Sequence, residues 1–218
     1  MLECLDLTCI RGDRLLFRGL SLCLERGESL RVVGANGVGK TSLLRLVAGL
    51  ARPEAGEVRW RGEPIGRQGE NFRSELLYAG HAVAVSDQLT ALENLRFACA
   101  VAGMDAHENA DEEACAAALA RLGLGGALDL PLAVLSLGQR RRVGLARLFL
   151  SASRALWVLD EPFTALDADA VKLLAEQVSA HCKAGGMAIY TTHQEVELGH
   201  ASRVLDPGDF GSGGRRAC

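Results

Sequence analysis

The residues best suited to do chemistry in this chain lie in GANGVGKT, which occupies positions 34–41. This stretch fits the pattern G-x-x-x-x-G-K-[ST] and stands between an apolar run and a segment with helical spacing, as a phosphate-binding loop requires. Glycines let backbone N–H groups turn inward around phosphate oxygens, and the following helix adds the positive end of its dipole. Lys40 would reach the β- and γ-phosphates of a nucleotide, and the Thr41 hydroxyl would bind Mg²⁺. The expected cofactor-binding residues of the loop are Gly34, Ala35, Asn36, Gly37, Val38, Gly39, Lys40, Thr41 and Ser42.

Two adjacent acids follow a second apolar run in LWVLDE, residues 156–161. The carboxyl ends of strands form the edge of an open α/β sheet at which ligands bind. Asp160 is therefore suited to hold Mg²⁺ through water, and Glu161 to polarise a water that attacks phosphate. A strand can also end in two acids and a proline simply on leaving a sheet, but the phosphate-binding loop in the same chain favours the catalytic interpretation.

A second phosphate-binding element is predicted in LSLGQRRRVGLAR, residues 135–147. Ser136 and Gly138 at the start of a helix would present a hydroxyl and backbone N–H groups outward. One chain has no use for two separate phosphate cradles, whereas two chains packed head-to-tail could close both on one γ-phosphate. The three arginines that follow, Arg140, Arg141 and Arg142, are expected to form a solvated helix face.

These motifs need an α/β framework, and the remaining segments predict one. Alternating apolar residues predict an antiparallel hairpin over the first 28 or so residues, and RPEAGEVRWRGEPI predicts a second hairpin with turns at Pro53, Gly56 and Gly62. Strands alternating with helices over the rest of the chain imply a mainly parallel sheet with right-handed crossovers. The strands expected there are 29–33, 155–159 and 186–192, and the helices are 41–50, 135–150 and 167–181.

The composition changes between residues 91 and 124, where the segments are rich in alanine, have helical spacing and lack strand-like runs. We expect a small helical subdomain, about residues 88–150, inserted into the α/β core. The core and its insertion are expected to form one domain over residues 1–206. The Gly- and Ser-rich tail, residues 207–218, is expected to be flexible.

Composition narrows the classes of function. With 218 residues, 49% of them hydrophobic and 23% charged, the chain is globular and large enough for one ordinary core. A net charge of −3 argues against a nucleic-acid binder that relies on a basic surface. The seven cysteines include no CxxC pair, which favours reduced thiols over a zinc or dithiol site. No apolar run approaches the roughly 20 residues that span a bilayer, so any membrane association would come through partners only.

Five motifs in this order, GANGVGKT, LSLGQ, LDEP, TALD and TTHQ, resemble those of the ATP-binding cassette family across nearly the whole chain. The resemblance implies a cassette with a mainly parallel P-loop sheet, an N-terminal antiparallel β subdomain and an inserted helical signature subdomain. It also implies ATP hydrolysis with Mg²⁺ by an ATP-dependent dimer. By this resemblance Ser136, Gly138 and Gln139 form the signature loop, at the start of the signature helix, and act in trans on the partner's ATP. Asp167 of TALD would bridge the dimer interface, and His193 would be a switch residue that contacts the γ-phosphate.

Two positions depart from the family pattern. A glutamine is usual in the loop that leads to the helical subdomain, and counting back from the run at 89–95 places His81 there. Imidazole can still hydrogen-bond water or the metal, with a charge that depends on pH near neutrality, so His81 is a candidate catalytic residue, and a core-facing structural histidine is the alternative. An aromatic residue normally stacks on adenine just before the first glycine of the N-terminal hairpin. Arg11 precedes Gly12 here, and its guanidinium plane can stack on a base.

Within the family, the chain most resembles the ATP-binding subunits of the bacterial haem exporters of cytochrome c maturation. TALENLRF, RPEAGEVRW, DEPFTALD, TTHQ and the histidine of LLYAGH carry this resemblance. It implies integral membrane permease subunits as partners, a peripheral place on the cytoplasmic face of the bacterial inner membrane, and no nucleic acid. Neither Cys-Pro nor CxxCH occurs in the sequence, consistent with a motor subunit that does not touch haem.

Three other functions stay open from the sequence. The chain could drive another small exporter of lipid or drug, act on DNA or ribosomes, or regulate by binding nucleotide without turnover. Residues 42–134, which separate the two phosphate-binding motifs, leave no room for the long coiled coil of DNA-repair members, and the chain has one cassette where ribosome-acting members have two. Glu161 and His193 count against a module without turnover.

Overall fold

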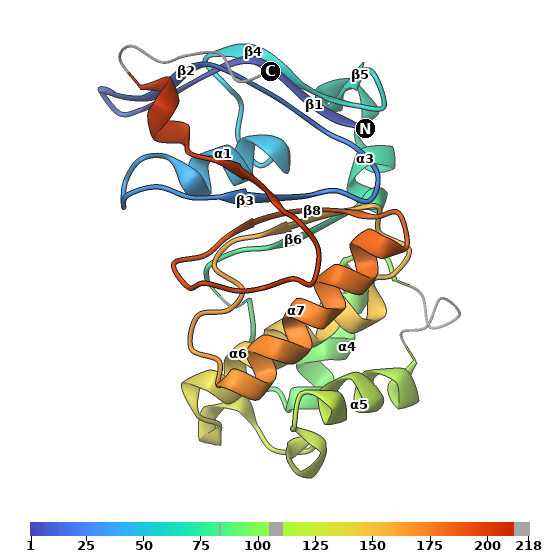
Figure 1. Cartoon of the computed structure of the whole chain (residues 1–218). Coiled ribbons are helices and arrows are strands. Elements are labelled where there is room, and N and C mark those ends of the chain that lie inside the picture. Colours follow the sequence, from blue (N-terminus) through green and yellow to red (C-terminus); the bar gives the residue numbers. More distant parts are fainter. Residues whose placement is uncertain (83, 105–110, 212–218) are drawn as a thin grey trace.

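The computed structural model describes residues 1–82, 84–104 and 111–211, which form two sheets and a group of helices stacked in layers (Figure 1). One sheet is antiparallel, in the order β2-β1-β4-β5, and the other is parallel, in the order β6-β7-β8-β3-β9. The helical group lies on the far side of the parallel sheet from the antiparallel one. This arrangement confirms the predicted fold class.

The antiparallel sheet contains both predicted hairpins. β1 (Leu2–Arg11) pairs with β2 (Arg14–Leu24), and β4 (Ala55–Trp60) pairs with β1 and with the short β5 (Glu63–Pro64). Gly56, where a turn was expected, lies inside β4 instead. It has a φ of +84°, and a Cβ there would lie 2.3 Å from the carbonyl oxygen of Leu5. Only glycine therefore allows β4 to approach β1 this closely.

The parallel sheet carries the functional motifs at the carboxyl ends of its strands. Its central strands, β7 (Leu156–Leu159) and β8 (Met187–Thr191), are buried at every position, which explains why they read as continuous apolar runs. Next to β8 lies β3 (Ser29–Val32). The edge strands β6 (Leu76–Ala79) and β9 (Arg203–Leu205) were not expected. β9 has three residues, of which only Leu205 is buried, so it shows no clear apolar pattern.

Helices cover both faces of the parallel sheet. α1 (Lys40–Val47) lies between the two sheets, with Leu43, Leu44, Leu46 and Val47 buried, and α7 (Ala168–Lys183) packs on the opposite face (Figure 1). Two short helices, α2 (Ile65–Gln68) and α3 (Glu70–Glu75), connect β5 to β6. Short 3-10 turns occupy Gly125–Ala127, Leu132–Val134, Arg147–Leu150 and Pro207–Phe210.

The helical insertion has a hydrophobic core of its own. α4 (Ala91–Val101), α5 (Glu112–Arg121) and α6 (Leu137–Ala146) bury residues such as Leu95, Leu119 and Val143 against one another. Each helix begins with a side-chain cap, from Thr90, Asp111 and Ser136 respectively. Such caps satisfy backbone N–H groups that have no partner within the helix, so the local sequence determines where each helix starts.

Two segments differ from the expectations. The helix expected over 135–150 ends at Ala146 and tightens into the 3-10 turn, as is frequent at helix ends. Residues 207–210 belong to the folded core, although a flexible tail was expected from 207 onward, because Asp206 caps the turn by accepting from the Gly208 N–H and Phe210 is 3% exposed. The expected tail at 212–218 lies outside the described residues.

Candidate nucleotide-binding and catalytic site

The phosphate-binding loop joins β3 to α1. Gly34, Gly37 and Gly39 have φ values of +119°, +78° and +112°, in the left-handed region that favours glycine. A Cβ at Gly39 would lie 3.1 Å from the Phe17 ring, so the loop is also packed closely under β2. Lys40 Nζ donates to the carbonyl oxygens of Gly34 at 2.7 Å and Ala35 at 3.2 Å. Its ammonium therefore lies across the loop, where phosphate would bind.

A cavity of about 510 Å³ opens above this loop. It is bounded by the loop, the β1–β2 hairpin, and the segments that follow β6, β7 and β8. The structure thus brings together most of the residues that the sequence nominated from four separate motifs. The residues that line the cavity are Arg11, Arg14, Leu16, Asn36, Gly37, Gly39, Lys40, Thr41, Ser42, His81, Asp160, Glu161 and His193.

Asp160 is 2% exposed and follows β7 directly. Its Oδ1 accepts from the Thr191 hydroxyl at 2.8 Å, whereas its Oδ2 is buried with no hydrogen-bond partner among the described residues. A buried carboxylate oxygen without a partner is costly, so a cation or its bound water fits this position. The Thr41 hydroxyl lines the same cavity. One carboxylate and one hydroxyl, with phosphates, form the kind of oxygen site that suits Mg²⁺.

Glu161 is 8% exposed and has a φ of +54°, which is uncommon for a residue with a side chain. Its Oε1 lies 3.3 Å from His193 Nε2. The Thr191 hydroxyl accepts from the Glu161 N–H at 2.7 Å while donating to Asp160. Thr191 therefore orients both acids, and sequence reasoning missed it. The sequence signal that could have found Thr191 is its place at the end of β8, the strand next to β7, which Asp160 and Glu161 follow.

His81 and Arg14 also line the cavity. The side chain of His81 is exposed and lines the cavity, so the core-facing alternative for this histidine is wrong. No aromatic residue lines the cavity in the part of the chain that the structure describes. Arg11, the expected stacking residue, is joined there by Arg14, which the sequence analysis did not nominate. Two guanidinium groups thus frame the part of the cavity next to the hairpin.

The signature residues lie outside this cavity. Ser136 Oγ accepts from the Gln139 N–H at 3.2 Å, and Gln139 Oε1 accepts from the Ser136 N–H at 2.9 Å, a reciprocal capping box at the start of α6. Gly138 lies against the next motif, since a Cβ there would be 3.0 Å from the Ala165 carbonyl oxygen. Asp167 caps α7, and its pKa is lowered by the bond from the Ala170 N–H and then by Arg142. Within one chain, neither Ser136 nor Asp167 meets the phosphate-binding loop.

The arginine row 140–142 is not a solvated helix face. Arg140 donates to Asp87 at 2.9 Å, Arg142 pairs with Asp167, and Arg141 is only 7% exposed. Arg141 donates to the carbonyl oxygens of the cavity residues His81 and Glu161, both at 2.6 Å. Successive helical residues are rotated by about 100°, so three in a row cannot all face solvent on a helix that packs into a core.

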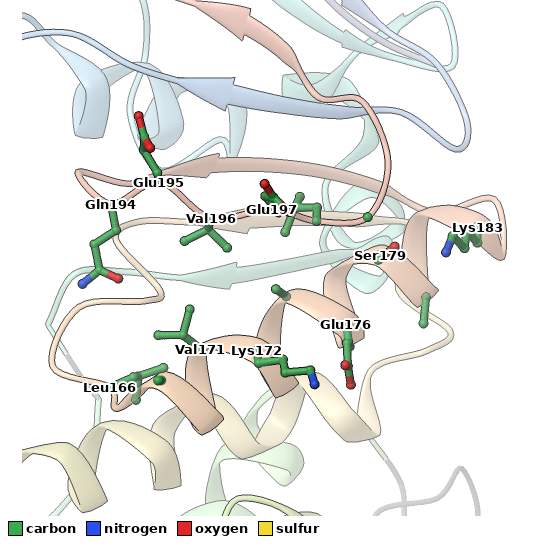
Figure 2. A pocket seen from close by; sticks show the side chains of 15 residues that line it. Leu166, Val171, Lys172, Glu176, Ser179, Lys183, Gln194, Glu195, Val196 and Glu197 are labelled. Carbon is green, nitrogen blue, oxygen red and sulfur yellow. The ribbon is translucent and has the colours of Figure 1, made fainter.

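A larger cavity, about 810 Å³, lies between α7 and residues 194–199. Figure 2 shows Val171 of α7 and Val196 of the facing segment pointing into the space between them. Charged side chains of both signs, including Lys172 and Glu195, stand around it. It contains none of the residues of the predicted phosphate-binding loop, so the smaller cavity is the candidate nucleotide site.

Comparison with known proteins agrees with this geometry. A family model described as ABC transporter matches residues 17–164. The cytochrome c biogenesis ATP-binding export protein CcmA of Aromatoleum aromaticum is 62% identical over 94% of this chain and 94% of its own length. The CcmA proteins of Nitrosospira multiformis and Escherichia coli K12 are 51% and 46% identical, over 92% and 91% of this chain and 95% and 91% of their own lengths.

Solved structures show the same fold. An ATP-binding subunit of an ABC transporter superposes with a TM-score of 0.77 at 26% identity, over 88% of this chain and 80% of that one. A dimeric ATP-binding cassette, solved in a post-hydrolysis state with ADP and Pi, superposes with a TM-score of 0.77 at 22% identity, over 95% of each chain.

Proposed function

The chain belongs to the ABC transporter family, and on that premise we propose that it is the ATP-hydrolysing subunit of the haem exporter of cytochrome c biogenesis. ATP binding and hydrolysis are the activity of the family. The export role is supported by identity of 62% to a cytochrome c biogenesis export protein along nearly the whole length of both chains. The observation that supports hydrolysis most directly is a cavity in which the phosphate-binding loop faces a buried pair of acids.

The predicted residues of the cavity have distinct roles in this proposal. Backbone N–H groups of the loop and Lys40 bind the β- and γ-phosphates of ATP. Glu161 accepts a proton from the attacking water, and His193 orients that carboxylate and the γ-phosphate. Thr41 and Asp160 would hold Mg²⁺, which supplies charge neutralisation on the phosphates when bound. His81, in the loop after β6, lines the edge of the site, where its imidazole would hydrogen-bond water.

The signature residues complete the site of a second copy. Ser136 is exposed and lies outside its own chain's cavity, as do Gly138, Gln139 and Asp167. Its neighbours Val134 and Leu137 are 67% and 73% exposed, so apolar surface surrounds a hydroxyl that can donate to phosphate. We therefore place the signature loop of one cassette over the ATP of its partner, with Asp167 near the dimer axis.

The membrane part of the exporter is assigned to partners. Among the helices of the described residues, none has the length and apolar character to cross a bilayer. In the proposed complex, integral permease subunits hold the cassette dimer at the cytoplasmic face of the bacterial inner membrane. Nucleic acid has no part in it.

The test is deletion of the gene followed by haem staining of covalent c-type cytochromes. We expect these cytochromes to disappear and to return with the wild-type gene but not with Glu161→Gln, which serves as a matched control because the amide keeps the shape of the acid. Normal cytochromes in a deletion strain that has no second copy would refute the export role. Increased drug sensitivity or altered lipid export in that strain would instead indicate another small exporter.

A further inference from the structure

Arg141 joins three parts of the molecule that are far apart in the sequence. It lies in the middle of α6 and is 7% exposed. Its Nη1 donates to the His81 carbonyl oxygen at 2.6 Å, and its Nη2 donates to the carbonyl oxygens of Glu161 at 2.6 Å and Asp160 at 3.3 Å. One guanidinium thus connects the signature helix to the loop after β6 and to the carboxyl end of β7.

These contacts bear on the catalytic carboxylate through its backbone. Glu161 has a φ of +54°, a conformation that is unfavourable for a residue with a side chain and persists only where neighbouring groups enforce it. Its N–H is held by the Thr191 hydroxyl and its C=O by Arg141. Because φ and ψ set the direction of the Cα–Cβ bond, the bond to Arg141 helps to determine where the carboxylate points.

We propose that Arg141 is a positioning residue for ATP hydrolysis, which aims Glu161 and fixes the His81 loop by tying both to the signature helix. This inference rests on the proposed role of Glu161 as the general base. Through these hydrogen bonds, a change in the orientation of α6 would shift Glu161 and the His81 loop of the same chain. An arginine is needed because its rigid fork donates from two nitrogens at once, whereas a lysine presents a single point charge.

Arg141 also brings a buried positive charge to the site. Burial lowers the pKa of Arg141, and the carboxylates of Asp160 and Glu161 act in the opposite direction. A guanidinium stays charged in proteins, so Arg141 places a buried positive charge behind two buried acids.

Arg154 provides a matched control for a merely structural role. It is 6% exposed and also donates to two carbonyl oxygens, those of Ser74 in α3 and Ala102 after α4. It does not line the phosphate cavity. Arg154→Lys therefore weakens the same kind of buried contact without changing a residue of the site.

The experiment compares the full-length wild type with Arg141→Lys and Arg154→Lys, alone and with the membrane proteins that co-purify with it. We expect Arg141→Lys to lower kcat about 10-fold or more while the Kd for ATP changes less than about 2-fold. Arg154→Lys should lower the melting temperature and leave kcat within about 2-fold. If Arg141→Lys does not fold, Arg141→Gln, which keeps one amide donor, replaces it.

A double-mutant cycle separates positioning from packing. In single-turnover hydrolysis, Arg141→Lys should have little further effect in a Glu161→Gln background, because a residue that acts through Glu161 has nothing left to aim. Fully additive effects, or a wild-type kcat in Arg141→Lys, would overturn the positioning role. A wild type without ATPase activity, or with turnover insensitive to Glu161→Gln, would overturn the proposed function itself, so the two failures are distinguishable.

Discussion

Replacing Thr191 by valine should disable both acids at once, because one hydroxyl serves them both. The side chain is 0% exposed, its Oγ1 accepts from the Glu161 N–H at 2.7 Å, and it donates to Asp160 Oδ1 at 2.8 Å. Valine keeps the shape and removes both bonds. The Asp160 carboxylate would then have neither oxygen bonded to a protein side chain among the described residues.

The magnitude of this change follows from the two bonds. A hydrogen bond to a charged group is worth about 1.5–3 kcal/mol, and a buried N–H left without a partner costs about 1–3 kcal/mol. A combined loss of about 3 kcal/mol corresponds to a fall of about 6–12 °C in melting temperature for a chain of this size. Turnover should fall by about 10-fold or more, since both acids lose their orientation.

The assay is thermal unfolding and ATP hydrolysis of Thr191→Val beside Thr8→Val. Thr8 is also a buried strand residue, 8% exposed, but it lies in β1 and contacts neither acid. Its variant should stay within about 2 °C and about 2-fold of wild type in both measurements. A Thr191→Val protein that matches this control would refute the argument that the hydroxyl holds the acids in place.

Three further predictions follow from the site and the core. Lys40→Ala should largely abolish ATP binding with little change in unliganded melting temperature, and unchanged affinity would contradict the phosphate-loop assignment. Glu161→Gln should trap an ATP-bound dimer, visible by light scattering, and adding Ser136→Arg should prevent it; equal dimerisation of the double variant would exclude the shared nucleotide. His181 stacks on Trp157 with the two ring centroids 3.9 Å apart, and its burial lowers the pKa of His181 to about 4, below its ordinary 6.5. The unfolded chain therefore binds the proton first, so stability should fall between pH 6.5 and 4, and in urea titrations His181→Phe should reduce this fall.

Local, contiguous patterns made the candidate nucleotide site recognisable in the sequence. The loop at 34–41 combines a strand end, glycines and a helix start in consecutive residues, so its sequence specifies both its shape and its chemistry. Asp160 and Glu161 were equally visible, because the carboxyl end of an apolar strand in an α/β sheet has a known position. The helix starts at Thr90 and Ser136 follow from caps within three residues.

Contacts between distant segments could not be predicted in this way. Arg141 meets the carbonyl oxygens of His81 and Glu161, and Thr191 meets both acids, only once the strands and α6 have assembled. A row of arginines and a threonine in a TT pair carry no local sign of these partners. The strand β9 was not predicted for the same reason, because its pairing with β3 defines it more than its own sequence does.

Two separate requirements limit which residue can occupy position 136: it must accept a hydrogen bond as a helix cap, and in the proposed dimer it must donate one to phosphate. As a cap the serine uses an acceptor lone pair, toward the Gln139 N–H, which leaves its hydroxyl proton available. Aspartate is as good a helix cap as serine, yet it has no proton to offer and would repel phosphate. Ser136→Asp should therefore preserve α6 and still prevent sharing of nucleotide between copies. Helix capping alone would accept several residue types at position 136. The additional need to donate a hydrogen bond to the partner's phosphate restricts the position to a residue with a hydroxyl.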